Sequence, residues 1–431
     1  MTPRLFLRNF RSLLPPFHRR QEESLAWLSA AHARAQATAD HNEDSFAEWQ
    51  TRLGRLVRRY GCSPPHIARR RSELEDFLHE DWTRMRVFNL LDSPRGETIS
   101  ARSQFYSETV NRLAAEYFAD DLDGPDELLH VSCTGYVAPG PIQRLMSERG
   151  WHDHTQATQI YHHGCFAAVT ALRVASGLLA QRQLIAMRQT AAARQPALAE
   201  IAAAPVIDKL IAGAGIGHGL PGHNGFHAEP HSSFRAEIFH TELCTLHFNP
   251  LDHSPEQLVV QSLFADGHIR YAMVSTESES ESDALEVLAA REHLAPDSLE
   301  DMTWGLSEFG FRMTLSRDVP VKIAEALKPF LRRMFADAGL DYDTEAPLAA
   351  FAIHPGGPRI IDSVQTLLEL DDDQTTHSRR VLAERGNMSS ATLPHVWAAL
   401  LDDDKILPGT LIISMAFGPG LTIAGCLLRK C

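Results

Sequence analysis

Apolar positions along the chain follow two periods, one typical of helices and one of strands. Apolar side chains recur every three to four residues over 21–35, 102–119, 319–338, 359–370, 378–385 and 391–401, which predicts helices there. A similar pattern over 44–90, broken at 61–65, predicts two more helices. Apolar or β-branched runs bounded by turn residues predict strands at 128–133, 155–161, 234–248, 268–275, 349–353, 409–414 and 421–428. Strands alternating with helices are typical of a layered α/β fold.

One stretch, Tyr-His-His-Gly-Cys-Phe-Ala-Ala at 161–168, joins a predicted strand to a helix expected over 165–182. This helix is apolar nearly all round, with Arg173 its only charge before residue 180, so we expect it inside a large core. Cys165 would lie on its first turn, where the helix dipole favours a thiolate. A lone buried cysteine is usually inert, so other residues must show whether Cys165 is a nucleophile.

Composition narrows the class of protein. The chain has 431 residues, 44% hydrophobic and 22% charged, which is enough for two large core units or one duplicated unit. A formal net charge of −14 argues against binding nucleic acid. Six scattered cysteines without a CxxC pair predict neither a disulfide framework nor a zinc site, and they suit the cytoplasm. We find no apolar run of membrane-spanning length and no secretory signal, so we expect no membrane partner.

Residues 187–235 differ in character from the rest of the chain. They are rich first in alanine and then in glycine and proline, and they hold a cluster of four histidines: His218, His223, His227 and His231. Gly and Pro inside the cluster disfavour a helix that would bring these histidines together. We therefore expect a mobile surface loop and no metal site.

Three polar residues occur in the same kind of context. Cys165, His354 and Asn387 each lie at a glycine-rich junction, His354 directly after an apolar strand and Asn387 between two helices. Loops held by rigid elements are where α/β proteins place their chemistry. A thiol, an imidazole and a carboxamide together make a nucleophile with two hydrogen-bond donors, although each signal alone is weak.

The chain resembles the thiolase superfamily and, within it, the ketoacyl synthase III and type III polyketide synthase (chalcone synthase-like) group. The matching phrases occur in family order and span the chain from about residue 15 onward: VSCTGYVAPG (131–140), GCFAA (164–168), LFADG (263–267), HPGGP (354–358), GNMSS (386–390) and FGPGLT (417–422). The resemblance implies a homodimer whose subunit has two similar halves in an αβαβα core. We expect the first half, with an insertion at 187–235, at 1–275 and the second at 276–431.

The resemblance also implies the chemistry, a decarboxylative Claisen condensation of an acyl thioester with a malonyl-type extender. Cys165 would carry the acyl group, and His354 and Asn387 would bind the extender's thioester carbonyl and stabilise the enolate. A thiolate–imidazolium pair would lower the pKa of the cysteine. No metal or organic cofactor is needed; the substrates are acyl-CoA and malonyl-CoA or carrier-protein thioesters.

Family position also suggests substrate-binding residues. Phe264 matches a phenylalanine near the acyl pocket, and Phe417 and Gly418 belong to the loop 416–420, whose N–H groups could complete an oxyanion hole with that of Cys165. The phosphates of coenzyme A imply a basic entrance, for which Arg69–Arg71 and Arg102 are candidates. The chain departs from the family in FADGH (264–268), in Ala416 and in the long insertion, which leaves acyl specificity open.

Several alternatives remain at this point. The enzyme could extend a starter repeatedly and cyclise it, or perform a single condensation that joins β-ketoacyl chains or uses a carrier protein. A papain-type Cys-His-Asn hydrolase has the same residue order, but its cysteine lies near the N-terminus in another context. An inactive partner subunit would not need all three residues.

Overall fold

The computed structural model describes residues 4–194, 233–277 and 281–431. Most of the insertion expected at 187–235, including His218, His223, His227 and His231, therefore lies outside the described residues. The division into two domains at 1–275 and 276–431 stays a prediction. The strands of the central sheet come in two groups from these same two parts of the chain.

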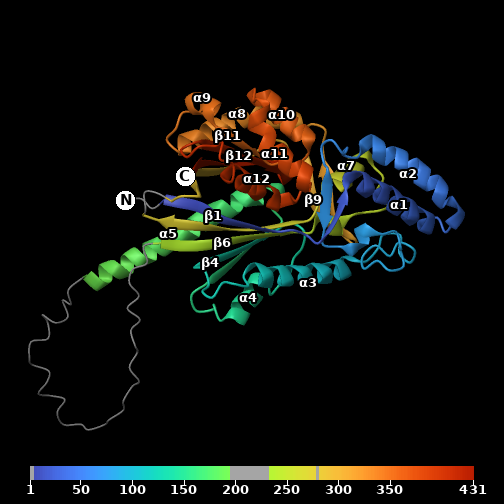
Figure 1. Ribbon diagram of the computed structural model, residues 1–431, viewed down its shortest axis with the longest axis horizontal. Coiled ribbons are helices and arrows are strands. Elements are labelled where there is room, and N and C mark those ends of the chain that lie inside the picture. Colours follow the sequence, from blue (N-terminus) through green and yellow to red (C-terminus); the bar gives the residue numbers. More distant parts are fainter. Residues whose placement is uncertain (1–3, 195–232, 278–280) are drawn as a thin grey trace, which may run out of the picture.

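A nine-stranded mixed sheet forms the centre of the molecule (Figure 1). Its order is β11-β12-β13-β8-β1-β7-β6-β4-β5. The strands are β1 (Arg4–Leu13), β4 (Glu127–Ser132), β5 (Gln156–Tyr161), β6 (Ser233–Glu242), β7 (Gly267–Thr276), β8 (Leu285–Leu294), β11 (Ala350–Ile353), β12 (Leu411–Gly418) and β13 (Thr422–Lys430).

Two sets of four strands repeat one arrangement within this sheet. In the series β4-β6-β7-β1 the first pair is parallel and the next two are antiparallel, and β11-β12-β13-β8 follows the same rule. The two series meet through β1 and β8, where Phe6 pairs with Glu286 and Leu7 with Leu285. The expected two similar halves are therefore present, joined edge to edge in one sheet.

Helices cover both faces of each half and complete five layers (Figure 1). Helices α5 (Ala167–Arg194) and α12 (Thr392–Leu401) lie between the halves, and α5 packs against β4, β6, β8 and β13. Outside the first half lie α3 (Ile99–Tyr117) and α4 (Pro141–Arg149), and outside the second lie α8 (Val319–Asp337) and α10 (Pro358–Leu368). This arrangement confirms the predicted αβαβα fold. A helix that is apolar on all sides must be buried on all sides, and the middle layer provides this burial.

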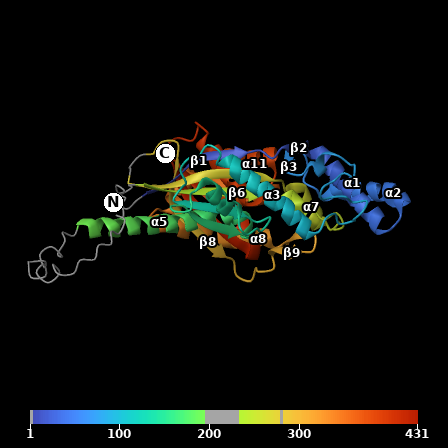
Figure 2. The same cartoon turned by 90° about the horizontal axis from the view of Figure 1, so that it is seen from below.

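Helix α5 is also long and apolar enough, by length and composition alone, to cross a membrane, over Gly164–Thr190. However, 61% of its most apolar window is buried inside the protein. Its composition is explained by its place in the central layer, and the end of the helix projects beyond the sheet (Figure 2).

A smaller lobe lies at the opposite end of the molecule (Figure 2). It contains α1 (Gln21–Ala39), α2 (Phe46–Tyr60) and a small antiparallel sheet in which β2 (Phe17–Arg20) pairs with β3 (Arg69–Ser72). Within residues 44–90 the α-helix ends at Tyr60 and only a 3-10 turn, Glu75–Leu78, follows, so the second long helix expected there is wrong. The remaining elements are α7 (Pro255–Leu263), the hairpin β9 (Met302–Ser307) with β10 (Gly310–Leu315), α9 (Tyr342–Glu345) and α11 (Asp372–Arg385).

Candidate active site

Cys165 lies on a short turn of 3-10 helix, Gly164–Phe166, between β5 and α5. The preceding Gly164 has φ of 75°, and a Cβ there would lie 2.5 Å from Pro419 Cδ, so only glycine fits. Cys165 is buried and retains 8% exposure. Cys165 is therefore held rigidly on the first turn before α5, where the sequence places it.

A second turn of the same kind faces it. The 3-10 turn Ser389–Ala391 begins α12, and the two turns contact each other. The Cys165 thiol lies 3.9 Å from Ser389 Oγ, and Asn387 Oδ1 accepts the N–H of Ser389 at 2.9 Å. Because both helices point their N-termini at the thiol, their dipoles favour negative charge there.

His354 follows β11 directly, and its backbone N–H donates to Met415 O at 2.8 Å. Its imidazole is 1% exposed, and neither ring nitrogen has a hydrogen-bond partner among the described residues. The ring lies over Gly356, whose carbonyl accepts a hydrogen bond from Asn387 Nδ2 at 3.3 Å. Contacts therefore link Cys165, Ser389, Asn387, Gly356 and His354 in sequence, while the catalytic roles assigned to them stay predictions.

Burial keeps both the thiol and the imidazole neutral in the free protein. It raises the pKa of Cys165 to about 12, against hydrogen bonds from Ser389 and Asn387 that lower it. Burial also lowers the pKa of His354 to about 3. The expected lowering of the cysteine pKa is therefore wrong for the free protein, because desolvation outweighs the helix dipole.

Cys165 opens into a cavity between the halves. Its lining includes several polar groups and an apolar wall: Cys133, Thr134, Gly164, Cys165, Cys244, Phe264, Met302, Thr303, Trp304, Met313, Ser389 and Pro419. Phe264, predicted to lie at the acyl pocket, lines this cavity and a second one beside it. It is also bridged to Asn387, since Ala265 N–H donates to Asn387 O at 2.9 Å.

Phe417 and Gly418 occupy a different position from Phe264. Phe417 is 4% exposed and packs in the core beneath α8, and neither residue lines the cavities described here. A Cβ on Gly418 would lie 2.4 Å from Phe166 Cδ1, so this glycine lets β12 approach the Cys165 turn. Pro419 is the member of the loop that reaches the cavity, and a binding role for Phe417 and Gly418 stays a prediction.

A buried carboxylate next to the cavity escaped the sequence analysis. Glu242, at the end of β6, is completely buried and accepts hydrogen bonds from Cys133 N–H at 3.0 Å, Thr134 Oγ1 at 2.9 Å and Ser390 Oγ. Burial raises its pKa to about 7 despite these donors. The sequence analysis also did not predict four residues that line the cavity: Ser389, Cys133, Cys244 and Trp304. The first two lie inside the family phrases at 386–390 and 131–140.

Two candidates for a basic entrance have another role. Arg70 is buried, and its guanidinium donates to Gln21 Oε1 and to the carbonyls of Gln261 and Phe264. Arg102 is fully buried and donates to four backbone carbonyls, of residues 95, 97, 246 and 248. Both arginines hold loops together and are not available to a ligand. Of the four candidates for a basic entrance, Arg69 is exposed and Arg71 is half-buried.

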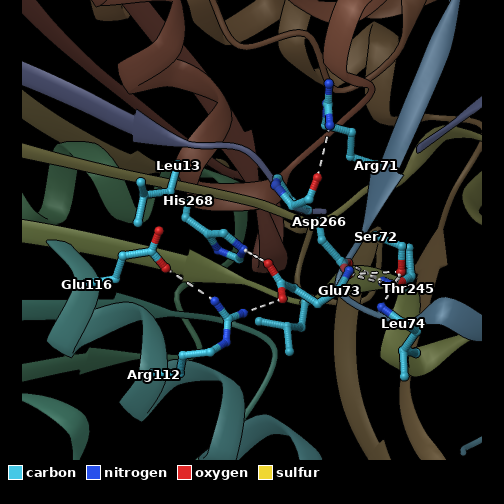
Figure 3. A network of polar contacts seen from close by, with 12 residues as sticks. Leu13, Arg71, Ser72, Glu73, Leu74, Arg112, Glu116, Thr245, Asp266 and His268 are labelled. Atoms are coloured by element: carbon cyan, nitrogen blue, oxygen red, sulfur yellow. Dashed lines mark hydrogen bonds and ion pairs between the residues drawn. The ribbon is translucent and has the colours of Figure 1, made fainter. Parts of the chain in front are cut away.

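A polar network fixes the β3 segment beside the cavity wall (Figure 3). Asp266 accepts the N–H groups of Glu73 at 2.7 Å and Thr245 at 2.8 Å, and also the Thr245 hydroxyl. Glu73 in turn pairs with Arg112 at 2.6 Å and His268 at 3.1 Å. Because Thr245 follows Cys244, this network holds one side of the cavity in place.

Comparisons with known proteins agree with this geometry. Residues 286–431 match the family model "Chalcone and stilbene synthases, C-terminal domain". The chain is 25% identical over 344 residues to "Type III polyketide synthase A" of Arabidopsis thaliana, covering 77% of this chain and 74% of the relative. It is 26% identical over 308 residues to "1,3,6,8-tetrahydroxynaphthalene synthase" of Streptomyces coelicolor, covering 72% and 66%. The crystal structure of the C-terminal type III polyketide synthase domain of "Steely1" from Dictyostelium superposes with a TM-score of 0.73 at 22% identity, covering 99% of each chain, which shows the shared fold.

Proposed function

We propose that this chain, which belongs to the type III polyketide synthase group of the thiolase superfamily, builds its product through an acyl thioester on Cys165. As a polyketide synthase it is an acyltransferase that catalyses Claisen condensation with malonyl-CoA. We infer from the site that an acyl thioester forms on Cys165 and that the reaction proceeds in two half-reactions. The form in which the starter reaches the site is also part of this inference.

The observation that carries the proposal is the unpartnered imidazole of His354. Burying a polar ring without hydrogen bonds costs free energy, and both nitrogens of His354 are in this state. A substrate carbonyl would satisfy one of them, beside the Asn387 carboxamide. In this proposal a thioester oxygen of the bound substrate accepts that hydrogen bond.

The first half-reaction loads the starter. The Cys165 thiol gives its proton to the His354 imidazole, and the resulting thiolate attacks the carbonyl carbon of the acyl thioester. Coenzyme A leaves as a thiolate and takes the proton back, so that an acyl-S-cysteine and a free thiol result. The ion pair exists only during transfer, since burial favours the neutral pair.

The second half-reaction extends the chain. Malonyl-CoA loses CO₂ while His354 and Asn387 donate hydrogen bonds to its thioester oxygen, which carries the enolate charge. The enolate carbon then attacks the acyl carbon on Cys165, and the cysteine leaves as the thiolate. Preorganised donors of this kind typically contribute about 10²–10³-fold each in rate.

Two hydrogen-bond donors, a thiol and a bound thioester complete this chemistry, so we propose no metal or organic cofactor. The proposal includes delivery of the starter as acyl-CoA or as a carrier-protein thioester, and one or several condensations. A cytoplasmic location suits the free thiols of the six cysteines.

We also propose a homodimer. Strand β5 is the last strand of the sheet and pairs only with β4 on its inner side among the described strands. A second copy of β5 would satisfy its open edge. Light scattering after gel filtration should give twice the mass of the chain, and a monomer at micromolar concentration would contradict this proposal.

The proposed function is tested on the wild-type protein. We expect an acyl adduct on Cys165, mapped by peptide mass spectrometry after incubation with a panel of acyl-CoA thioesters, and CO₂ release from malonyl-CoA. The variant Cys431→Ser is the matched control, because it removes a half-exposed thiol at the C-terminus. Peptide cleavage without an adduct would instead support a hydrolase, and neither activity with any acyl-CoA or acyl-carrier substrate would support an inactive partner.

A further inference from the structure

Helix α2 lies at the outer end of the smaller lobe, and one of its sides faces solvent (Figure 2). Four exposed arginines on that side form what we call the arginine row: Arg52, Arg55, Arg58 and Arg59. The helix contains a single acidic residue, Glu48, which precedes all four. The row therefore gives α2 a strongly positive surface in a chain whose formal net charge is −14.

The spacing of these arginines places them together on the helix. At 3.6 residues per turn, positions 52, 55, 58 and 59 fall within about one third of the circumference. The opposite side carries the residues that α2 buries, Leu53, Gly54 and Val57. Neighbouring arginines are thus three or four residues apart, a spacing at which like charges repel and destabilise a helix.

Carboxylates of the chain itself do not relieve this repulsion. Other arginines of the same region have acidic partners. Arg34 pairs with Glu43 at 2.6 Å, and Arg312 pairs with Asp252 at 3.1 Å. Within residues 4–194, 233–277 and 281–431, by contrast, no member of the arginine row makes an ion pair. Its positive charge is therefore available to a partner from outside the chain.

Neither ring contacts nor the helix dipole account for the whole row. The Arg52 guanidinium lies 4.9 Å from the ring centroid of Trp49, and that of Arg59 lies 5.3 Å from Tyr60. A guanidinium that stacks on a ring keeps its N–H groups in its own plane, where they can still donate. The dipole favours cations in the last turn, where Arg58 and Arg59 lie, but the other two arginines precede that turn.

The end of the row lies next to the wall of the cavity that contains Cys165. Gly61 follows α2 and approaches α7 so closely that a Cβ on it would lie 3.5 Å from Ser262 Cβ. The next residue, Cys62, donates its N–H to Ser262 Oγ at 2.8 Å. Ser262 stands two residues before Phe264, which lines this cavity and the second one beside it. A partner bound to the arginine row would thus be held close to the nucleophile's cavity.

We propose that the arginine row is the docking surface of an acidic carrier protein that delivers an acyl thioester to Cys165. This inference rests on the proposed function, because it names a partner of the same site. Carboxylates on a helix of the carrier would accept paired hydrogen bonds from the guanidinium groups. The thioester of a carrier protein lies at the end of a long flexible arm, so the carrier can stay on the surface while the thioester enters the cavity.

The extent of the row favours a protein over the phosphates of coenzyme A. Positions 52 and 59 are about 10 Å apart along the helix axis. Side chains on the convex surface of a helix diverge, whereas a small phosphate group needs donors that converge on it. A protein surface with several spaced carboxylates can instead contact the row along its length. Complementary charge also speeds the encounter of the two proteins.

The test compares one acyl group, the one that wild type loads fastest, on three thioesters: a purified acidic acyl carrier protein, coenzyme A and N-acetylcysteamine. The variant Arg55→Glu/Arg59→Glu reverses two charges of the row one turn apart. We expect its kcat/KM for the acyl carrier protein to fall about 30-fold or more, because repulsion replaces attraction at both contacts. For acyl-CoA it should change less than about threefold, since the solvent screens exposed charges. For the N-acetylcysteamine thioester it should stay at the wild-type value.

Salt and a matched variant provide the controls. The wild-type kcat/KM for the acyl carrier protein should fall about tenfold between roughly 50 and 300 mM NaCl, and that of the double variant should not fall. Arg333→Glu/Lys405→Glu reverses two exposed charges outside the smaller lobe. It should keep the wild-type values with all three thioesters. A loss in this control equal to that in the double variant would overturn the proposal, because net charge and not the arginine row would be responsible.

Other outcomes also decide the matter. Equal losses with the carrier protein and with acyl-CoA would overturn the proposal, since the row would then bind phosphates. So would an unchanged kcat/KM with the carrier protein, or a wild type that accepts acyl-CoA but no acyl carrier protein. If the double variant is inactive with all three thioesters, Arg55→Gln repeats the comparison, and unchanged selectivity there counts against the proposal. Wild type that forms no adduct on Cys165 from any thioester would instead refute the proposed function, which is a separate result.

Discussion

The two central helices, α5 and α12, begin in the same way but bring different chemistry to the site. Each starts with a 3-10 turn, Gly164–Phe166 or Ser389–Ala391, and these two turns meet between the halves. The turn before α5 carries the thiol of Cys165. The turn before α12 carries Ser389 and follows Asn387, so it presents hydroxyl and carboxamide groups.

This difference shows how a repeated fold becomes an asymmetric site. The first half supplies one nucleophile, and the second supplies donors from two places, His354 after β11 and Asn387 before α12. Neither half holds the whole set, and the helix dipoles of both point at the same space. The comparison predicts that changes in the first half stop acyl loading, while changes in the second mainly stop decarboxylation.

The largest expected effect is that of Cys165→Ala, which removes the thiol that we assign as the acyl carrier. We expect no acyl adduct by intact-protein mass spectrometry and no condensed product. CO₂ release from malonyl-CoA should continue at a reduced rate, since the donors of the second half are intact. An adduct that persists in this variant would show that another thiol, such as that of Cys133 or Cys244, serves as the nucleophile.

The next largest effect is that of His354→Ala and Asn387→Ala in the second half. Each should lower the rate of CO₂ release from malonyl-CoA by about 10²–10³-fold, the usual cost of losing one preorganised donor. Acyl loading on Cys165 should fall less in Asn387→Ala, measured by mass spectrometry at short times. His377→Gln is the control, because it alters a buried histidine that pairs with Asp403 and does not line the cavity. Full condensation activity in Asn387→Ala would refute its assigned role.

Much of this arrangement follows from the sequence. The glycine before Cys165, the apolar helix after it and the alternation of strands with helices predict the α/β layers and the place of the thiol, because they depend on local backbone and hydrophobic patterns. Family phrases bring His354 and Asn387 to the same region. The repeat of strand order, by contrast, is visible only in the sheet pairing.

Other features depend on contacts between distant residues and cannot be predicted from local patterns. Strand β8 reads LEVLAAREHL with only its first two residues buried, yet it joins the two halves of the sheet. Arg70 and Arg102 look like surface charges in the sequence, but backbone carbonyls from several loops surround them. Burial of the Cys165 thiol likewise outweighs the helix dipole that the sequence shows.

The alkylation rate of Cys165 should depend on pH in a way that distinguishes a neutral thiol and imidazole from an ion pair. Thiolate is the reactive form, so a pKa of about 12 for Cys165 means that its alkylation rate by iodoacetamide should rise about tenfold per pH unit from pH 7 to 10. A stable thiolate–imidazolium pair would instead give a rate that is already level above neutral pH. Stopped samples digested for peptide mass spectrometry separate Cys165 from the other five cysteines.

The smallest expected effect is that of Gly418→Ala. It tests whether the close contact between β12, in the second half, and the turn that carries Cys165, in the first half, is needed. In Gly418→Ala the new Cβ would lie 2.4 Å from Phe166 Cδ1, so the strand or the turn must shift. Overpacking of this kind costs about 1–3 kcal/mol of unfolding free energy, measured by urea denaturation, and should slow acyl loading. Gly177→Ala on α5 is the control, since nothing lies within 4 Å of its new Cβ and helix propensity should add about 0.5–1 kcal/mol of stability. Equal stability and loading in both variants would mean that the two halves do not depend on this contact, and that the Cys165 turn is set by the first half alone.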